Sequence, residues 1–151
     1  MHSRLLPLMI LFAVACGDSG PETDKFVGLW RLTSVNAQPL PAVGNATGGE
    51  VWAAAVLEVS GETGFFDRCM EAPSPSTRTS RSTPVILAAT GRNQVSVAYF
   101  DRRANAPDTA SLSGTQLTLR YRNTLTVPPE VDVLTFAPLE GALPVACSLV
   151  P

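Results

Sequence analysis

The side chains that could act as general bases, nucleophiles or metal ligands are few in this sequence of 151 residues. The one histidine is His2, close to the N-terminus, and the one lysine is Lys25. Proton transfer and nucleophilic attack near neutral pH depend mostly on histidine, on a tuned lysine or cysteine, or on carboxylates. The three cysteines, Cys16, Cys69 and Cys147, are therefore the residues whose chemistry has to be explained first.

The spacing of the carboxylates in the sequence does not identify any two of them as a catalytic pair. We expect the side chains of Glu58, Asp67, Glu71, Asp101 and Asp132 to be solvated at the surface. Transition-metal sites built from histidine and cysteine lack ligands, and neither an EF-hand run nor a glycine-rich phosphate loop is present. The sequence therefore predicts a protein that is not an enzyme and that has no metal and no cofactor.

Basic residues are scattered along the chain. Lys and Arg number 11 against 13 acidic residues, for a formal net charge of −2. From Arg31 to Arg122 only Arg102 and Arg103 are adjacent, so we interpret the arginines as a solvated surface rather than an anion site. No nucleic-acid partner is expected.

The N-terminus has the layout of a secretory signal peptide, with a basic start at Arg4 and an apolar run from Leu5 to Val14. That run is shorter than the roughly 20 residues that span a bilayer. The sequence Ala13-Val14-Ala15-Cys16 resembles the lipobox of bacterial lipoproteins. The resemblance implies cleavage of residues 1–15 and acyl chains such as palmitate on Cys16. The alternative is ordinary cleavage that leaves a free thiol.

Two or more acyl chains anchor a protein stably, whereas one chain binds a membrane only marginally. Gly17 follows the cysteine, so the aspartate that resembles an inner-membrane retention signal is absent. We therefore expect export across the inner membrane and lipid anchoring in the outer membrane, facing the periplasm or the cell surface. Residues 16–25 are expected to form a tether and residues 26–151 the domain, and the oligomeric state stays open.

Cys69 and Cys147 remain as an even pair in an oxidising compartment, which favours a disulfide bond between them. Two unpaired buried thiols are the alternative.

The folded part has the pattern of short strands separated by turns. In the clearest strand, Leu117, Leu119 and Tyr121 alternate with polar residues. Residues 38–49 and 72–83 are expected to be loops, and elsewhere the gaps are too short for crossover helices. We expect an all-β, antiparallel up-and-down meander barrel of about eight strands, since closure removes exposed edges. The expected strands are 28–36, 51–59, 65–70, 84–89, 95–99, 110–112, 116–122 and 131–137.

The stretch Phe26-Val27-Gly28-Leu29-Trp30 resembles the G-x-W opening strand of lipocalins, and 110–119 and 133–136 are similar to their closing strands. The chain thus resembles bacterial lipocalin-like lipoproteins. The resemblance implies that Trp30 plugs the closed end of the barrel, that Gly28 lets the incoming segment pass close to it, and that a Cys69 to Cys147 bridge ties the C-terminal tail to the wall. Because the last strand lacks the arginine that lipocalins stack on this tryptophan, a related small barrel is the alternative.

Eight strands enclose an interior that side chains can fill or that can hold one small ligand. The small residues Ala53, Ala54 and Ala55 favour space, whereas aromatic residues such as Phe65, Phe66, Phe100 and Phe136 could fill it. Two functions follow: binding of a small hydrophobic ligand, or a structural or assembly role in the cell envelope with a filled barrel. The candidate ligand-lining residues are Val95, Val97, Tyr99, Leu117, Leu119 and Tyr121.

Overall fold

The computed structural model describes residues 22–72, 77–101, 107–123, 126–141 and 146–149. The expected signal peptide and Cys16, the expected lipidation site, lie outside these residues. In chain order the elements are η1 (Glu22–Phe26), β1 (Gly28–Val35), β2 (Gln38–Pro39), β3 (Ala42–Val43), β4 (Val51–Ser60), β5 (Thr63–Glu71), β6 (Arg78–Gly91), β7 (Gln94–Tyr99), β8 (Asp108–Ser113), β9 (Gln116–Asn123), β10 (Glu130–Pro138) and η2 (Ala146–Leu149).

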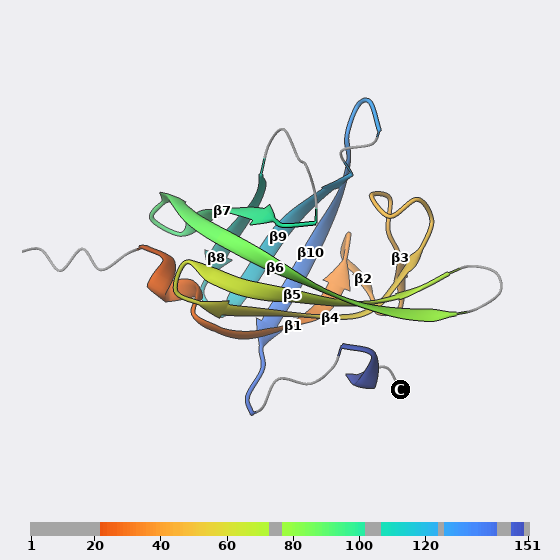
Figure 1. Ribbon diagram of the computed structural model, residues 1–151, viewed down its shortest axis with the longest axis horizontal. Coiled ribbons are helices and arrows are strands. Elements are labelled where there is room, and N and C mark those ends of the chain that lie inside the picture. Colours follow the sequence, from red (N-terminus) through yellow and green to blue (C-terminus); the bar gives the residue numbers. More distant parts are fainter. Residues whose placement is uncertain (1–21, 73–76, 102–106, 124–125, 142–145, 150–151) are drawn as a thin grey trace, which may run out of the picture.

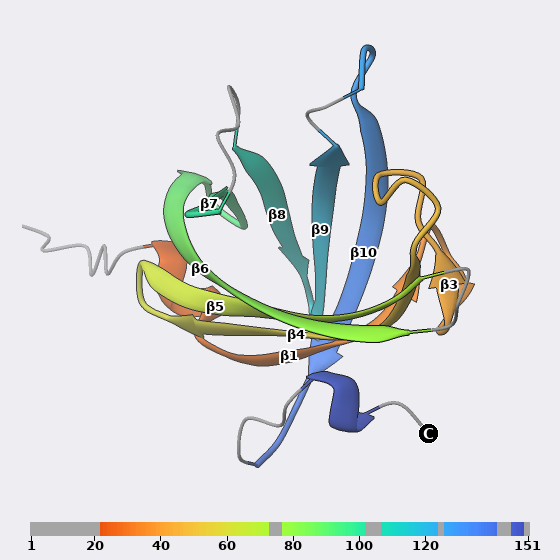
Figure 2. The same cartoon turned by 45° about the vertical axis from the view of Figure 1, so that its right-hand side comes forward.

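The strands form a closed antiparallel barrel (Figures 1 and 2). Each strand from β4 to β10 pairs with the next along the chain, and β1 pairs with both β10 and β4 and so closes the sheet. Eight strands make the wall, while β2 and β3 are two-residue additions at its rim. The expected all-β, up-and-down barrel is confirmed.

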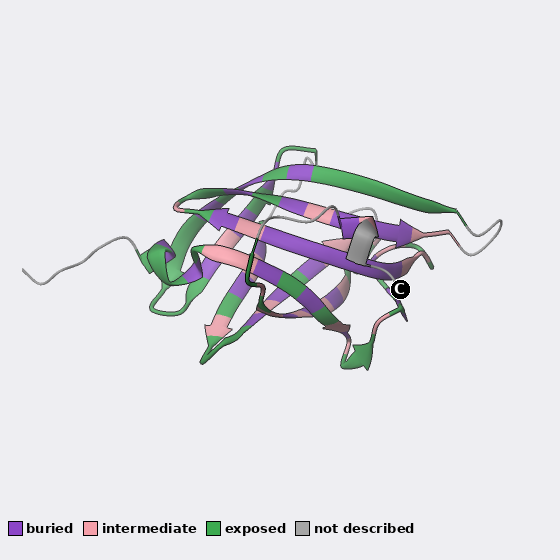
Figure 3. Ribbon diagram, turned by 90° about the horizontal axis from the view of Figure 1, so that it is seen from below, coloured by how far each residue is buried: buried purple, intermediate pink, exposed green. Residues whose placement is uncertain are grey.

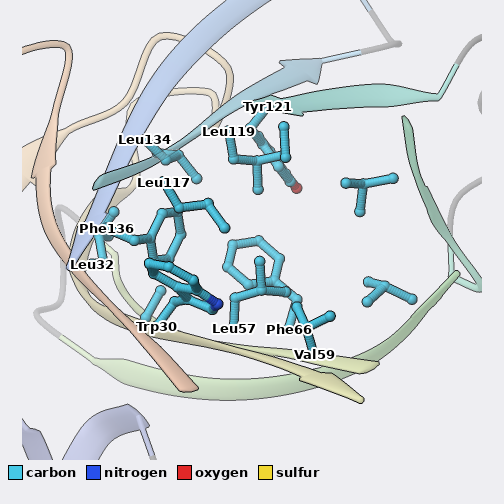
Figure 4. Packing of buried hydrophobic residues seen from close by; sticks show 14 of the residues in the cluster. Trp30, Leu32, Leu57, Val59, Phe66, Leu117, Leu119, Tyr121, Leu134 and Phe136 are labelled. Atoms are coloured by element: carbon cyan, nitrogen blue, oxygen red, sulfur yellow. The ribbon is translucent and has the colours of Figure 1, made fainter. Parts of the chain in front are cut away.

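Alternation along each strand builds the core. In β9, Leu117, Leu119 and Tyr121 are buried while Arg120 between them is exposed. Figure 4 shows these side chains converging with Phe66 and residues of β1, β4 and β10 on the barrel interior. Burial of these apolar faces drives closure at about 25 cal/mol per Å² removed from water.

Strand β6 is longer than the sequence predicts. Residues 72–83 were expected to form a loop, but β6 begins at Arg78 and pairs with β5 in continuous register from Glu71 and Arg78 to Thr63 and Ile86. The loop prediction is wrong for residues 78–83. Residues 78–82 are exposed on both faces, so no apolar alternation marks them, and backbone pairing with β5 holds them extended.

One end of the barrel is closed by the N-terminal segment. Residues 22–26 form the 3₁₀ helix η1, in which Phe26 is fully buried. The indole Nε1 of Trp30 donates a hydrogen bond of 2.8 Å to the Phe26 carbonyl. The turns after β4, β6 and β8 lie at this end, and the loops after β1, β5, β7 and β9 lie at the other, which we call the mouth.

Helix η2 lies against the outer face of β4 and β5 (Figure 3). Cys147 on η2 forms a disulfide with Cys69 on β5, with a Cα–Cα distance of 4.9 Å. Ala53 and Ala54 pack with this bridge and with Ala146. These two small residues therefore make room for η2 outside the barrel, not for a ligand inside it.

Candidate functional site

A cleft of about 320 Å³ opens at the mouth of the barrel. Five elements supply its walls: the loop between β3 and β4, and the mouth ends of β4, β5, β6 and β9. Its lining combines buried aromatic and sulfur side chains with arginines: Ala46, Thr47, Gly48, Glu50, Trp52, Arg68, Met70, Arg81, Tyr121, Arg122 and Asn123. Small molecules usually bind in concave sites that combine apolar surface with a few convergent polar groups.

Arg68 is the central polar residue of the mouth cleft. It points inward from β5, and its side chain is only 8% exposed. Nη1 donates a hydrogen bond of 2.7 Å to the Tyr121 hydroxyl, and Nη2 donates one of 2.8 Å to Thr83 Oγ1. Nη2 also lies 3.2 Å from Asp101 Oδ2, on a side chain that is 44% exposed. A buried guanidinium needs such partners because an isolated charge in the interior is costly.

Arg68 also lies over aromatic rings. Its Cζ atom is 5.3 Å from the centroid of Phe66 and 5.8 Å from that of Tyr121. These distances are within the range of cation–π attraction, which strengthens where the cation is desolvated. The rings and hydrogen bonds together fix the orientation of the guanidinium at the boundary between the core and the cleft.

Below the cleft the barrel interior is filled by what we call the aromatic cluster: Trp52, Phe66, Tyr99, Tyr121 and Phe136. Phe66 lies at its centre, with centroids 6.0 to 6.3 Å from those of the other four rings. Trp52 and Tyr121 pack edge to face at 5.3 Å. Ring pairs at these distances are attractive and pack densely.

Asp132 holds the loop between β3 and β4 against the mouth. This carboxylate is fully buried on β10. Oδ1 accepts hydrogen bonds of 2.9 Å from Asn36 Nδ2 and 2.7 Å from the Asn45 amide. Oδ2 accepts bonds of 3.2 Å from the Ala46 amide and 3.1 Å from Trp52 Nε1. Four donors replace water around the charge and bind the loop to the wall.

Gly44 lies where this loop crosses the network. A Cβ atom at this position would overlap the Asp132 carboxylate and would lie 2.5 Å from Trp52 Nε1 and 2.8 Å from Thr47 Oγ1. The loop can approach the carboxylate only because no side chain is present.

The structure brings the six candidate ligand-lining residues together in the core. Val95, Val97 and Tyr99 point inward from β7, and Leu117, Leu119 and Tyr121 point inward from β9. Tyr99 and Tyr121 belong to the aromatic cluster, and the other four residues belong to the same buried core. Figure 4 shows Leu117, Leu119 and Tyr121 on the barrel interior. Tyr121 also lines the mouth cleft, and Val97 and Tyr99 line a smaller cleft of about 200 Å³.

The two residues of the barrel signature lie at the closed end. Gly28 has a φ of +139°, a conformation that residues with a side chain rarely adopt. A Cβ atom there would be 4.0 Å from Trp30 Nε1, which is ordinary contact. The backbone conformation, more than close passage of the chain, accounts for glycine at this position.

Two residues at the mouth depart from the sequence expectations. Asp132 was expected at the solvated surface but is fully buried. Arg68 was counted with the solvated arginines, yet it is enclosed. The alternation of Phe66 and Arg68 on β5 was the available signal, because both point to the same face of the strand.

Of the aromatic residues that could fill the interior, Phe66 and Phe136 do so, whereas Phe65 and Phe100 are 46% and 70% exposed on the outside. The described residues contain no group of three or more His, Cys, Asp or Glu that could hold a metal ion. Within the same residues, no helix has the length and apolar character needed to cross a bilayer.

Comparison with known proteins adds no relative: no protein family matches the chain, and no curated protein matches it.

Proposed function

We propose that this protein is a lipid-anchored envelope lipoprotein whose lipocalin-like barrel binds a small ligand at its mouth. The observation that carries the proposal is the mouth cleft, where a buried arginine and buried aromatic rings meet. Its volume of about 320 Å³ suits a small molecule, since such pockets start at roughly 300 Å³. Because the aromatic cluster occupies the interior, the cleft is a better binding site than the centre of the barrel.

The anchor part of the proposal rests on the lipobox-like sequence that ends at Cys16. In this proposal the protein is exported across the inner membrane and anchored by its lipid in the outer membrane. Cells grown with labelled palmitate should yield labelled wild-type protein in the membrane fraction and unlabelled Cys16→Ser protein in the soluble fraction. Unlabelled wild-type protein in the medium would contradict the anchor.

The binding part is tested on protein extracted gently from its native membrane. Native mass spectrometry should show the protein with an additional small mass, and gentle collisional activation should remove that mass. Bare protein alone, together with no change in melting temperature across a library of small molecules, would refute ligand binding.

A structural or assembly role in the cell envelope is the second candidate. The filled interior favours it, because the aromatic cluster leaves the barrel centre to side chains. This role predicts the refuting result above: a barrel with no bound small molecule and no response to added ones.

A further inference from the structure

Arginines outnumber carboxylates among the residues that line the mouth cleft, in a protein with a net charge of −2. Arg68, Arg81 and Arg122 line it, against one lining carboxylate, Glu50. Asp101 pairs with Arg68, and the buried Asp132 lies behind the lining residues Ala46 and Trp52. A cleft with low-dielectric walls concentrates the field of such groups. The lining therefore favours an anion of low charge over a cation.

Arg68 has donor capacity beyond its three hydrogen bonds. A guanidinium carries five N–H groups in a planar fork. Within the described part of the chain, Nε–H has no hydrogen-bond partner although it is shielded from water. A buried donor without an acceptor costs free energy, and a ligand oxygen recovers that cost only when the guanidinium turns Nε–H toward the cleft.

Arg81 lies directly across from Arg68 on the neighbouring strand. Directly opposed residues of antiparallel strands project from the same face of the sheet. Arg81 is exposed, and no carboxylate of the described residues forms an ion pair with it. Like charges directly opposite each other destabilise a strand pair, and Asp101 contacts only the Arg68 side of this one.

The other lining residues indicate the polarity of the uncharged part of the ligand. Met70 and Tyr121 keep a small exposed fraction, 6% and 8%, beside the arginines, while the fully buried Trp52 lies beneath them. These groups favour an apolar or aromatic body over a compact hydrated ion.

We propose that the mouth cleft binds a small organic carboxylate, whose charged group lies between Arg68 and Arg81 and whose apolar part packs on Met70 and Tyr121. This inference rests on the proposed binding site and names its ligand class. A single carboxylate fits better than a phosphate dianion, because Glu50 lines the cleft and Asp101 already contacts Arg68. Two nearby carboxylates repel each added negative charge of a ligand.

The test measures dissociation constants by calorimetry on the full-length protein in detergent micelles, with phenylacetate as the probe. The neutral isostere phenylacetamide and inorganic phosphate are the comparison ligands. We expect phenylacetate to bind at least about tenfold more tightly than either one, since an arginine-carboxylate contact is charge-assisted and directional. The dissociation constant for phenylacetate should rise with added salt, because salt screens the exposed Arg81.

Variants with opposite charge effects separate recognition from folding. Arg81→Gln removes an exposed charge and should weaken phenylacetate binding about fivefold, as one partly solvated charge contact does. Asp101→Asn removes the carboxylate that competes for Arg68 and should tighten binding. Arg120→Gln is the matched control, because Arg120 is an exposed arginine on β9 that does not line the cleft.

The outcomes distinguish this inference from the proposed site itself. Equal binding of phenylacetate and phenylacetamide, with no effect of Arg81→Gln, would overturn the carboxylate assignment and leave a neutral ligand at the same cleft. Tighter binding of inorganic phosphate than of phenylacetate would also overturn it. Binding of no probe, together with bare protein in native mass spectrometry, would remove the site as well.

Discussion

The buried carboxylate of Asp132 allows a sharp test of how the mouth is built. Asp132→Asn keeps the shape of the side chain but replaces one acceptor oxygen by a donor NH2 group. Each oxygen of Asp132 accepts two hydrogen bonds, so either orientation of the amide leaves two of the four donors facing another donor. The substitution therefore disrupts half of the network without creating a cavity.

The size of the effect follows from the number of donors affected. A buried donor that loses its acceptor costs about 1–3 kcal/mol, so two of them predict a loss of about 2–6 kcal/mol. For a domain of this size, each kcal/mol lowers the melting temperature by roughly 3–5 °C. We expect a fall of at least about 6 °C in the variant, by the same conversion.

Urea denaturation followed by tryptophan fluorescence measures this loss directly. Glu130→Gln is the matched control, since Glu130 lies two residues earlier on β10 with an exposed side chain. Its stability should stay within about 0.5 kcal/mol of the wild type, as for most surface substitutions. An equally small change for Asp132→Asn would refute the network as a stabilising feature.

Three further predictions concern the bridge, the loop and the core. Removing the disulfide by Cys69→Ala with Cys147→Ala should cost about 4 kcal/mol in chemical denaturation, because the bridge closes a separation of 78 residues; an unchanged midpoint would contradict this. Gly44→Ala should lower the melting temperature and shift Trp52 fluorescence, and an unshifted spectrum would show that the loop tolerates a Cβ atom. Phe66→Ala should cost about 3–5 kcal/mol in urea denaturation and the exposed neighbour Phe65→Ala far less, whereas equal costs would contradict a filled interior.

The fold was predictable because apolar and polar residues alternate along each strand, and this pattern can be read from neighbouring residues in the sequence. In β9 the sequence alone separates the buried Leu117 and Leu119 from the exposed Arg120, and short turns leave no room for crossover helices. The pairing of Cys69 with Cys147 was predicted from the expected oxidising compartment and from the even number of cysteines that remain after Cys16. The structure contains that bridge.

The mouth was not predictable, because its parts come from distant positions. Arg68 finds acceptors on Tyr121 and Thr83, 53 and 15 residues away. Asp132 binds a loop 86 and 87 residues earlier. Composition marks these residues as surface charges, and only strand register shows that they are enclosed. The exposed first residues of β6 were missed for the same reason, since only their pairing with β5 identifies them as a strand.

The central claim is that ligands bind at the mouth, above a filled barrel. The two indole N–H groups report on opposite ends, because Trp30 donates to Phe26 at the closed end and Trp52 donates to Asp132 at the mouth. Titration of labelled protein with phenylacetate, followed by the two indole signals in proton-nitrogen correlation spectra, tests the claim directly. We predict that the Trp52 signal shifts and saturates while the Trp30 signal stays in place. A Trp30 shift with an unchanged Trp52 signal would place the ligand inside the barrel and contradict the claim.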